Sequence, residues 1–361
     1  MTLLLVGLVL GASPSMAKVK KQTAPKQCST LEIIEQVNNH WQLTNKPEVT
    51  ASWDEAAYQT GNMEAYKLTG TAQYLEYADK WARHNKFSGA RGTDRSLWLK
   101  NYQKYGEDAN HVLFADWQIC FQTYLDLYEM NPNPYKMARA KEVMDYQCST
   151  RATDYWWWAD ALYMAMPVFS KLARLTGDNT YLDKMTACFL HSDSLMYDQD
   201  AHLYFRDGRF VYPAHQTDAG KKDFWARGNG WVLAAFAKVL QDMPAGYVHR
   251  SLFVQRFQSL AAAVAQCQQK EGYWTRSMLD AKQAEGPETS GTAFFTYGLL
   301  WGMNHGLLDE ATYLPVVNKA WKYLTGKALQ PDGSVGYVQP IGDKAIKGQQ
   351  LSAQSTANFG T

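Results

Sequence analysis

The chain has 361 residues, of which 46% are hydrophobic and 20% are charged. This composition excludes a disordered or collagen-like chain, and the length allows one large domain or two ordinary ones. Lys and Arg number 36 and Asp and Glu 35, so a net charge of +1 gives no reason to expect a nucleic-acid partner. The 13 Trp, 22 Tyr and 14 Phe suit either a sugar-binding groove or an aromatic core.

The first 17 residues look like a secretory signal peptide. Residues 2–10 are apolar, and the Ser-Met-Ala triplet at 15–17 places small residues at the −3 and −1 positions of a cleavage site. We therefore expect an exported protein, periplasmic or secreted, with a single domain over 18–361. No other run approaches about 18 apolar residues, so no membrane span is expected.

The absence of several motifs argues against phosphoryl transfer, nicotinamide chemistry and zinc hydrolysis. The sequence has no GxxxxGK[ST], GxGxxG, HExxH or GxSxG, and its eight histidines show no i,i+4 pair. Its five cysteines share no CxxC spacing, and their odd number leaves at least one thiol free. Cys120, Cys188 and Cys267 fall in apolar helical patterns and are expected to be buried. We expect no metal and no cofactor.

Nearly the whole chain shows the apolar period of α-helices. Two segments, beginning at Ala65 and Leu172, each end a helix at a glycine and open the next helix with Tyr-Leu. Repeating this hairpin gives outer helices with charged faces at about 29–43, 71–85, 134–147, 180–196, 248–268 and 311–327. Inner helices, rich in Ala, Gly, Met and aromatics, fall at about 54–69, 112–130, 156–176, 230–242, 291–305 and from 352 onward. The sequence thus predicts an all-α fold, an (α/α)6 barrel, with its last inner helix cut short by truncation or by its own brevity.

The longest predicted connections, 86–111, 197–228 and 269–290, all lead into inner helices. Residues that favour helix starts stand before these helices: Ser52 in a capping box with Glu55, Asn110, Thr153 or Asp154, Asn229, and the 289–291 triplet. Long loops gathered at one end of a barrel are where a functional site is expected.

Two aspartates near these helix starts are candidate catalytic residues. Asp160 follows three tryptophans at 156–158, and Asp116 has an equivalent place in the preceding inner helix. A carboxyl among aromatic side chains is partly desolvated, which raises its pKa and suits a general acid. A pair of carboxyls facing one cavity suits glycosidic chemistry. Two alternatives stay open: a helix dipole that lowers the pKa of Asp160, and a structural Arg paired with Asp116.

The segment 225–231, Trp-Ala-Arg-Gly-Asn-Gly-Trp, is a third candidate. Its glycines allow a close approach of the backbone, and the helix start offers free N–H groups to an anion. Arg227 adds a fork suited to a carboxylate, and Trp225 and Trp231 flank it. An acidic sugar would fit this set. The alternative is a tight capped turn with a tryptophan packed in the core.

These residues make the chain recognisable. It resembles the unsaturated glycuronyl hydrolases, chiefly the unsaturated rhamnogalacturonyl hydrolases of glycoside hydrolase family 105, with family 88 more distant. The motifs are WWWADALYMAMPVFSKLARLTGD, DFWARGNGWVLAAFAKVL and GPETSGTAFFTYGLLWG, supported by YLDLYEMNP and GLLDEATYLPVV, and the resemblance covers about residues 50–361. It implies an (α/α)6 barrel that needs no metal.

By this resemblance, Asp160 matches the catalytic aspartate and Asp116 a second acidic residue beside it. The substrate-binding residues expected from the resemblance and the motifs are Arg227, Trp231, Trp225, Asn229, Trp157, Arg206 and His202. Many members carry an Asp pair where this chain has Asp116 and Trp117. Many have a His in the loop where this chain has the 202–207 segment.

The implied reaction removes a 4,5-unsaturated uronic acid, foremost unsaturated galacturonic acid, from the non-reducing end of lyase-generated pectin oligosaccharides by vinyl-ether hydration. The expected partner is therefore an acidic oligosaccharide. Three alternatives are an unsaturated glucuronyl hydrolase, an ordinary two-carboxylate glycosidase acting on saturated sugars, and a non-catalytic glycan-binding protein. The sequence does not indicate an oligomeric state.

Overall fold

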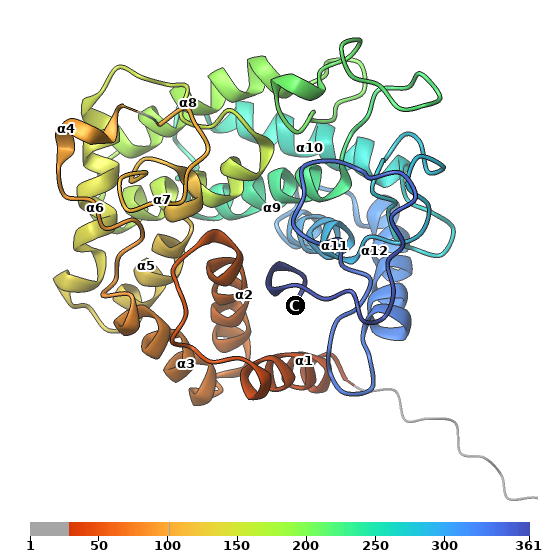
Figure 1. Ribbon diagram of the computed structural model, residues 1–361, viewed down its shortest axis with the longest axis horizontal. Coiled ribbons are helices and arrows are strands. Elements are labelled where there is room, and N and C mark those ends of the chain that lie inside the picture. Colours follow the sequence, from red (N-terminus) through yellow and green to blue (C-terminus); the bar gives the residue numbers. More distant parts are fainter. Residues whose placement is uncertain (1–28, 101) are drawn as a thin grey trace, which may run out of the picture.

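The computed structural model describes residues 29–100 and 102–361. The expected signal peptide at 1–17 therefore lies outside the described residues. Outer and inner helices alternate along the chain and form a ring (Figure 1). The outer helices are α1 (Thr30–Thr44), α3 (Ala72–His84), α6 (Pro134–Ser149), α8 (Thr180–Met196), α10 (Arg250–Gln266) and α12 (Glu310–Tyr323). The inner helices are α2 (Trp53–Thr69), α5 (Cys120–Met130), α7 (Ala159–Thr176), α9 (Ala226–Asp242) and α11 (Thr289–Asn304).

This alternation confirms the predicted (α/α)6 architecture. At the sixth inner position the described chain has a 3-10 turn at Asn358–Gly360. Its Phe359 ring stacks on Trp53 of α2, with 5.2 Å between the ring centroids. Figure 1 shows this C-terminal segment between α2 and α11.

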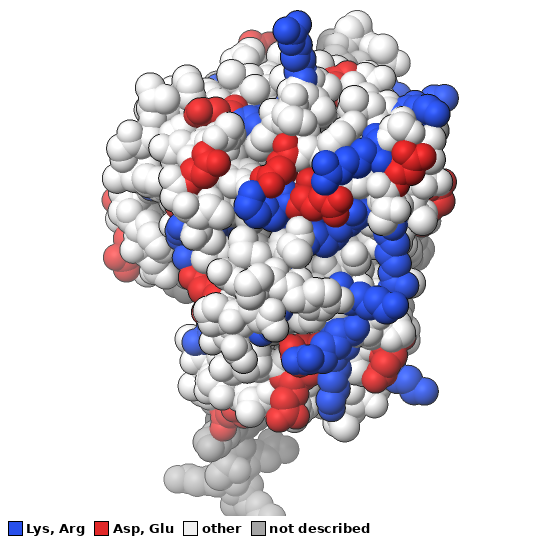
Figure 2. Space-filling view, turned by 90° about the vertical axis from the view of Figure 1, so that its left-hand side faces the viewer, with Lys and Arg blue, Asp and Glu red and all other residues white. Residues whose placement is uncertain are grey.

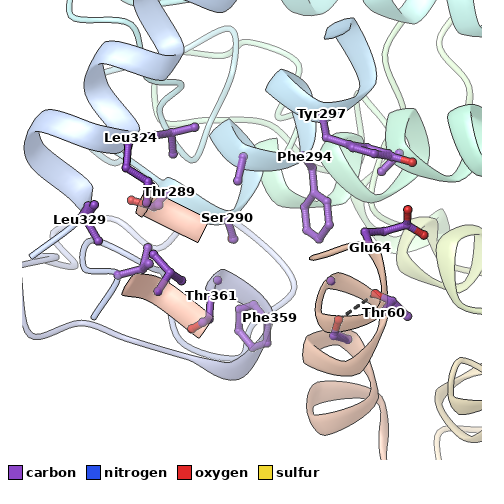
Figure 3. Close-up of a pocket in the computed structure, with 18 of the residues that line it drawn as sticks. Thr60, Glu64, Thr289, Ser290, Phe294, Tyr297, Leu324, Leu329, Phe359 and Thr361 are labelled. Carbon is purple, nitrogen blue, oxygen red and sulfur yellow. Dashed lines mark hydrogen bonds between the residues drawn. The ribbon is translucent and has the colours of Figure 1, made fainter. Parts of the chain in front are cut away.

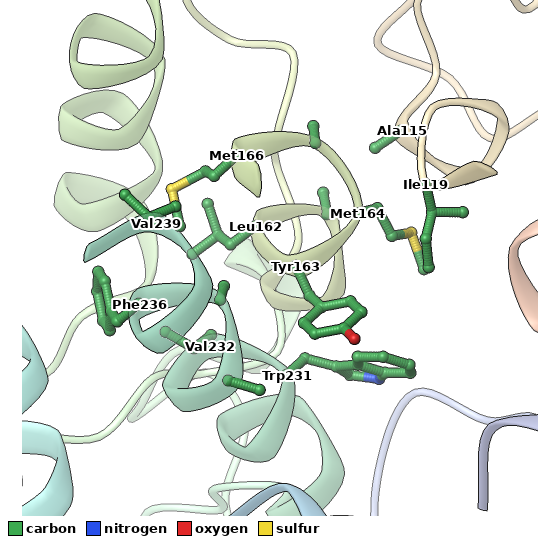
Figure 4. Packing of buried hydrophobic residues seen from close by; sticks show 14 of the residues in the cluster. Ala115, Ile119, Leu162, Tyr163, Met164, Met166, Trp231, Val232, Phe236 and Val239 are labelled. Atoms are coloured by element: carbon green, nitrogen blue, oxygen red, sulfur yellow. The ribbon is translucent and has the colours of Figure 1, made fainter. Parts of the chain in front are cut away.

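The inner helices pack closely because they carry small residues where they meet. A Cβ atom added to Gly298 of α11 would lie 2.7 Å from Cγ of Leu233 on α9, far closer than such atoms normally approach. On the other side of α9, Tyr163 of α7 packs against Trp231 with 4.7 Å between ring centroids (Figure 4). These contacts make α7, α9 and α11 a closely packed part of the ring.

Several inner helices do not begin where the local sequence suggests. Ser52 is the N-cap of α2, but its hydroxyl bonds to the carboxylate of Asp54 rather than to a backbone N–H, so the predicted capping box is wrong. Asn110 does not cap α5, because a 3-10 turn at Ala115–Trp117 comes between them. Asn229 lies inside α9, which starts three residues earlier than Asn229.

The start of α7 is set by a tertiary contact rather than by Thr153 or Asp154. Trp158 forms an isolated antiparallel bridge with Asp207, and the Ala159 N–H donates to the Arg206 carbonyl at 2.8 Å. This pairing holds the preceding residues out of the helix. The start of α11 agrees with the prediction, and Glu288 caps it by accepting from the N–H groups of the next helical turn.

The four cysteines in the described part of the chain are free thiols. Cys120 and Cys188 are buried as predicted, whereas Cys267 is only partly buried. No helix among residues 29–100 and 102–361 is long and apolar enough to span a bilayer.

A mostly apolar cavity of about 310 Å³ opens beside the C-terminal segment. Figure 3 shows Phe294 of α11 and Phe359 of the C-terminal turn facing it, with Leu324 and Leu329 on its far side. Its charged lining residues are Glu64 and Lys238. It holds no pair of carboxyls, so it lacks the feature that the sequence associates with catalysis.

Candidate active site

A second cavity, of about 530 Å³, lies where the inner helices begin. Its lining combines aromatic, acidic and basic side chains: Trp53, Tyr105, Asp116, Trp157, Trp158, Asp160, Met164, Arg206, Arg209, Arg227, Ile341, Gly342 and Asp343. The helix starts bring these residues together, because α2, α5, α7 and α9 all present their N-terminal ends here. The structure therefore places five of the nine candidate site residues in one cavity.

Asp160 is the second residue of α7 and is 7% exposed. The bridge between the start of α7 and residues 206–207 brings Arg206 against it, with 3.3 Å between Arg206 Nε and Asp160 Oδ2. Burial raises the pKa of Asp160 above its ordinary value, while the guanidinium groups of Arg206 and Arg227 oppose the shift. Asp160 is thus a desolvated carboxyl with a cation at contact distance.

Asp116 lies in the 3-10 turn before α5 and is 5% exposed. Its Oδ1 atom is buried without a hydrogen-bond partner. Burial raises the pKa of Asp116 well above its ordinary value, and the negative charges of Asp160 and Glu107 raise it further. Among the described residues no arginine forms an ion pair with Asp116. The alternative that Asp116 serves only as the partner of a structural arginine is therefore excluded.

Cations and aromatic rings surround the two carboxyls. Arg206 is held by Asp207 at 2.7 Å, and its guanidinium carbon lies 5.9 Å from the centre of the Trp157 ring. Arg209 stands at the rim, 62% exposed, and pairs with both Asp207 and Asp343. The site thus offers positive charge for an anionic group and an indole face for a sugar ring.

The structure does not place Trp231, Trp225, Asn229 or His202 in this cavity. Trp231 is fully buried between α7 and α11, where it contacts Tyr163 as Figure 4 shows. Trp225 is 2% exposed and donates from Nε1 to the Gln339 side chain at 2.8 Å. These two tryptophans therefore belong to the core in the described chain, which is the alternative that the sequence left open.

Asn229 and His202 support the loops behind the cavity. Asn229 is buried and binds both backbone groups of Tyr204, accepting from its N–H at 2.8 Å and donating to its carbonyl at 2.9 Å. His202 lies in a turn with a positive φ of 54°, and its Nδ1 is 2.8 Å from the hydroxyl of Tyr197. Asn229 therefore fixes the strand-like segment that carries Arg206.

Arg227 is in the cavity wall, but its guanidinium is already occupied. It is 1% exposed and donates to the backbone carbonyls of Gln339 at 2.5 Å and Pro340 at 2.8 Å. Its Cζ lies 4.6 Å from the ring centres of both Trp225 and Phe359. Arg227 thus holds Gln339 and Pro340 against α9, whereas the sequence predicts a direct contact with substrate.

We expect Arg227→Lys to lower stability rather than substrate affinity alone. Lysine keeps the charge but not the planar fork, so at least one charge-assisted hydrogen bond is lost, at a cost of about 1.5–3 kcal/mol. Arg83→Lys is the matched control, because its ion pair with Asp79 is exposed and exposed pairs contribute about 0–1 kcal/mol. Urea denaturation measures both. An Arg227→Lys protein of unchanged stability with a raised KM would favour the direct contact.

Three stretches of the cavity lining carry no local signal in the sequence. Tyr105 comes from the loop before α5, and Arg209 lies in the 3-10 turn Gly208–Phe210 that Asp207 caps. Residues 341–343 come from the C-terminal segment, more than 100 residues along the chain from α9. The 197–228 loop carries five basic and five acidic side chains, so its charge does not single out Arg209. Residues 341–343 are brought to the site by long-range contacts, since Arg227 binds the carbonyls just before them and Arg209 pairs with Asp343.

Within the described ranges, no cluster of three or more His, Cys, Asp or Glu side chains could hold a metal ion. The cavity's own chemistry consists of two carboxyls with raised pKa values, three arginines and tryptophan rings. Such a set can donate a proton, activate water and hold an anion.

Known proteins share this fold and much of this sequence. A solved structure described as glycosyl hydrolase family 88 from Bacteroides vulgatus is 53% identical and superposes with a TM-score of 0.89, covering 91% of this chain and 94% of that one. A solved structure described as "Polysaccharide Lyase BACCELL_00875" is 57% identical with a TM-score of 0.88, covering 91% and 92%. The unsaturated 3S-rhamnoglycuronyl hydrolase of Formosa agariphila is 34% identical over 316 residues, 86% of this chain and 81% of that protein.

The sequence also matches the family described as Glycosyl Hydrolase Family 88 over residues 26–361. The sequence motifs suggested the unsaturated glycuronyl hydrolases of the related families 105 and 88, and these matches confirm that recognition. A match over this length, together with the relatives above, makes the protein a glycoside hydrolase. The chain belongs to glycosyl hydrolase family 88.

Proposed function

We propose that this protein removes a 4,5-unsaturated uronic acid from the non-reducing end of acidic oligosaccharides by hydrating its double bond. The observation that carries the proposal is the pair of buried carboxyls, Asp116 and Asp160, facing Arg206 in one cavity. The Formosa agariphila relative supports it, since that protein is named an unsaturated 3S-rhamnoglycuronyl hydrolase.

The reaction needs one proton and one water molecule. A general acid protonates C4 of the unsaturated sugar, and water adds at C5 while its second proton passes to a base. The resulting hemiketal at C5 opens to a ketone, which leaves C1 as a hemiacetal of the next sugar. That hemiacetal breaks down and releases the next sugar as an alcohol and the uronate as an open-chain keto acid.

Asp160 has the position for both proton transfers in this proposal. Its raised pKa lets it hold the proton, and Arg206 at 3.3 Å stabilises the carboxylate left after transfer. Arg206 and Arg209 would face the uronate carboxylate, and Trp157 would stack on a sugar ring. Asp116, whose pKa is raised by burial and by the charge of Asp160, would share one proton with Asp160.

The test is the ultraviolet absorbance of the C4–C5 double bond, which is conjugated with the carboxylate. Incubation with unsaturated galacturonyl and glucuronyl disaccharides should make this absorbance fall, and the faster substrate identifies the sugar. Release of saturated sugars with no loss of absorbance would favour an ordinary glycosidase. Binding without any turnover would favour a glycan-binding protein.

A second candidate is eliminative cleavage, and one observation favours it: the 57% identical structure is described as a polysaccharide lyase. In that reaction a base removes the proton at C5 of a saturated uronate and an acid protonates the departing O4 substituent, which creates the double bond. The same two carboxyls and arginines could serve it. Absorbance would then rise on a saturated substrate, so the sign of the change separates the two candidates.

We further propose that the substrate derives from pectin and that the protein is exported. The apolar run at 2–10 and the Ser-Met-Ala triplet at 15–17 support export. A mature protein that begins at Lys18 is the expected result of N-terminal sequencing, and an intact Met1 in the cytosolic fraction would contradict it.

A further inference from the structure

One segment of the chain, residues 80–104, is far more basic than the rest. Residues 80–104 carry seven Lys and Arg and a single carboxylate, that of Asp94. The chain has 36 Lys and Arg, and four of the lysines precede residue 29, so the described residues carry 32 positive against 35 negative side chains. A local excess of six positive charges therefore lies on a body that is slightly acidic elsewhere.

Most of these cations are exposed and unpaired. Arg83 pairs with Asp79, and Arg95 of the short helix α4 (Arg95–Trp98) pairs with Glu142. The others, Lys80, Lys86, Arg91, Lys100 and Lys104, are exposed and form no ion pair within the described chain. We call these five residues the basic band. Figure 2 shows Lys and Arg side chains gathered along one side of the face that carries α4 and α6.

The segment that carries the band runs along α6, from its N-terminal to its C-terminal end. Near its start, the Lys86 carbonyl accepts from the hydroxyl of Tyr135, in the first turn of α6. Further on, the Gly92 carbonyl accepts from Arg139 at 2.8 Å, and the Arg95 carbonyl accepts from Tyr146 at 3.3 Å.

These contacts advance from residue 135 to residue 146 of α6, about 16 Å along a helix. The side chains of the band are thus spread over a length that fits an extended chain rather than a single ion.

The end of the band at Lys104 lies at the mouth of the active-site cavity. Tyr102 and Gln103 both donate to the carboxylate of Asp154, which anchors this end of the loop. Lys104 follows them, and the next residue, Tyr105, lines the cavity and is 64% exposed. Tyr105 lines the same cavity as Asp116 and Asp160, so this end of the loop lies beside the two carboxyls.

We propose that the basic band binds the acidic polysaccharide chain whose terminal sugar occupies the cavity. This inference rests on the proposed function and extends it: the preferred substrate is a long polyanion rather than a disaccharide. The cavity accepts one end of a glycan, and the band starts at its mouth, so successive anionic sugars would lie along residues 104 to 80. Continuity with the cavity favours a polysaccharide over a nucleic acid or a membrane as the partner.

The effect should be electrostatic and sensitive to salt. Exposed charges act through water and are screened beyond about 8–10 Å at physiological salt. Charge complementarity of this kind raises the rate of association, by about 10- to 1,000-fold, rather than the rate of the chemical step. The band should therefore change kcat/KM on long substrates at low ionic strength and leave kcat unchanged.

The experiment uses the triple variant K86A/K100A/K104A. These side chains make no ion pair and do not line the cavity, so the fold and the activity on an unsaturated disaccharide should be unchanged. On long lyase-generated polyuronate fragments, kcat/KM at low salt should fall about tenfold, and raising the salt concentration should remove the difference. Retardation in gels containing polygalacturonate should weaken in parallel.

The matched control is K282A/K319A/K322A, which removes three exposed lysines outside the band. Equal behaviour of the two triples on the long substrate and in the gel would overturn the proposal. Stronger retention of the unaltered protein by duplex DNA or by anionic vesicles than by polygalacturonate would overturn the choice of partner. A protein that turns over no unsaturated disaccharide fails the proposed function, and the gel measurement still decides whether the band binds the polyanion.

Discussion

Replacing Asp160 by asparagine should lower kcat on an unsaturated disaccharide by at least about 10²–10⁴-fold, the range expected when general acid–base catalysis is lost. Asparagine has nearly the same shape but can neither donate the carboxyl proton nor activate water. The interaction with Arg206 weakens, but the start of α7 is held by backbone contacts to residues 206–207, so the fold should persist. Initial rates followed by ultraviolet absorbance give the loss.

The control for this variant is Asp183→Asn, an equal change at an exposed position of α8. It should keep full activity, since substitutions at the surface rarely change stability by more than about 0.5 kcal/mol. Circular dichroism and Tm establish that both proteins fold. A folded Asp160→Asn protein with more than about a tenth of the activity would be incompatible with its proposed role, and Asp116 would then become the leading candidate.

The ring of helices could be predicted from the sequence because amphipathic periodicity is a local property. Charged faces mark α3 and α8 as outer helices, and small and aromatic residues mark α7 as inner, whatever lies beside them. The starts of the inner helices could not be predicted in the same way. Trp158 is kept out of α7 by pairing with Asp207, a partner 49 residues away along the chain.

The candidate site was predictable where chemistry and position coincide in one segment. Asp160 and Asp116 stand out because each is a carboxyl among aromatic residues at the start of an inner helix. Arg227 stands out for the same reason, yet its fork is filled by the carbonyls of Gln339 and Pro340. A sequence shows which side chain can bind an anion, but it does not show which distant backbone group reaches that side chain first.

Asp116 and Asp160 should titrate as a coupled pair. As a result, replacing Asp116 and replacing Arg206 should shift the pH profile of the activity in opposite directions. Burial raises both pKa values, the charge of Asp160 raises that of Asp116, and Arg206 lowers that of Asp160. Hydration requires a protonated acid, so activity should fall as pH rises through the upper pKa of the pair. A carboxylate neighbour moves this alkaline limb to higher pH, and a cation moves it to lower pH.

Asp116→Asn should therefore shift the alkaline limb of the kcat profile to lower pH and reduce the maximal rate about 10²-fold, the lower end of the range for lost proton-transfer catalysis. Arg206→Gln should shift the same limb to higher pH, because the cation that favours ionised Asp160 is gone. His202→Ala, outside the cavity, is the control and should leave the limb in place. Because kcat reports the enzyme with substrate bound, weaker binding by Arg206→Gln does not affect this comparison. A shift of both variants to lower pH would mean that Arg206 does not favour the ionised form of Asp160. A shift of both to higher pH would mean that the charge of Asp116 does not raise the upper pKa of the pair.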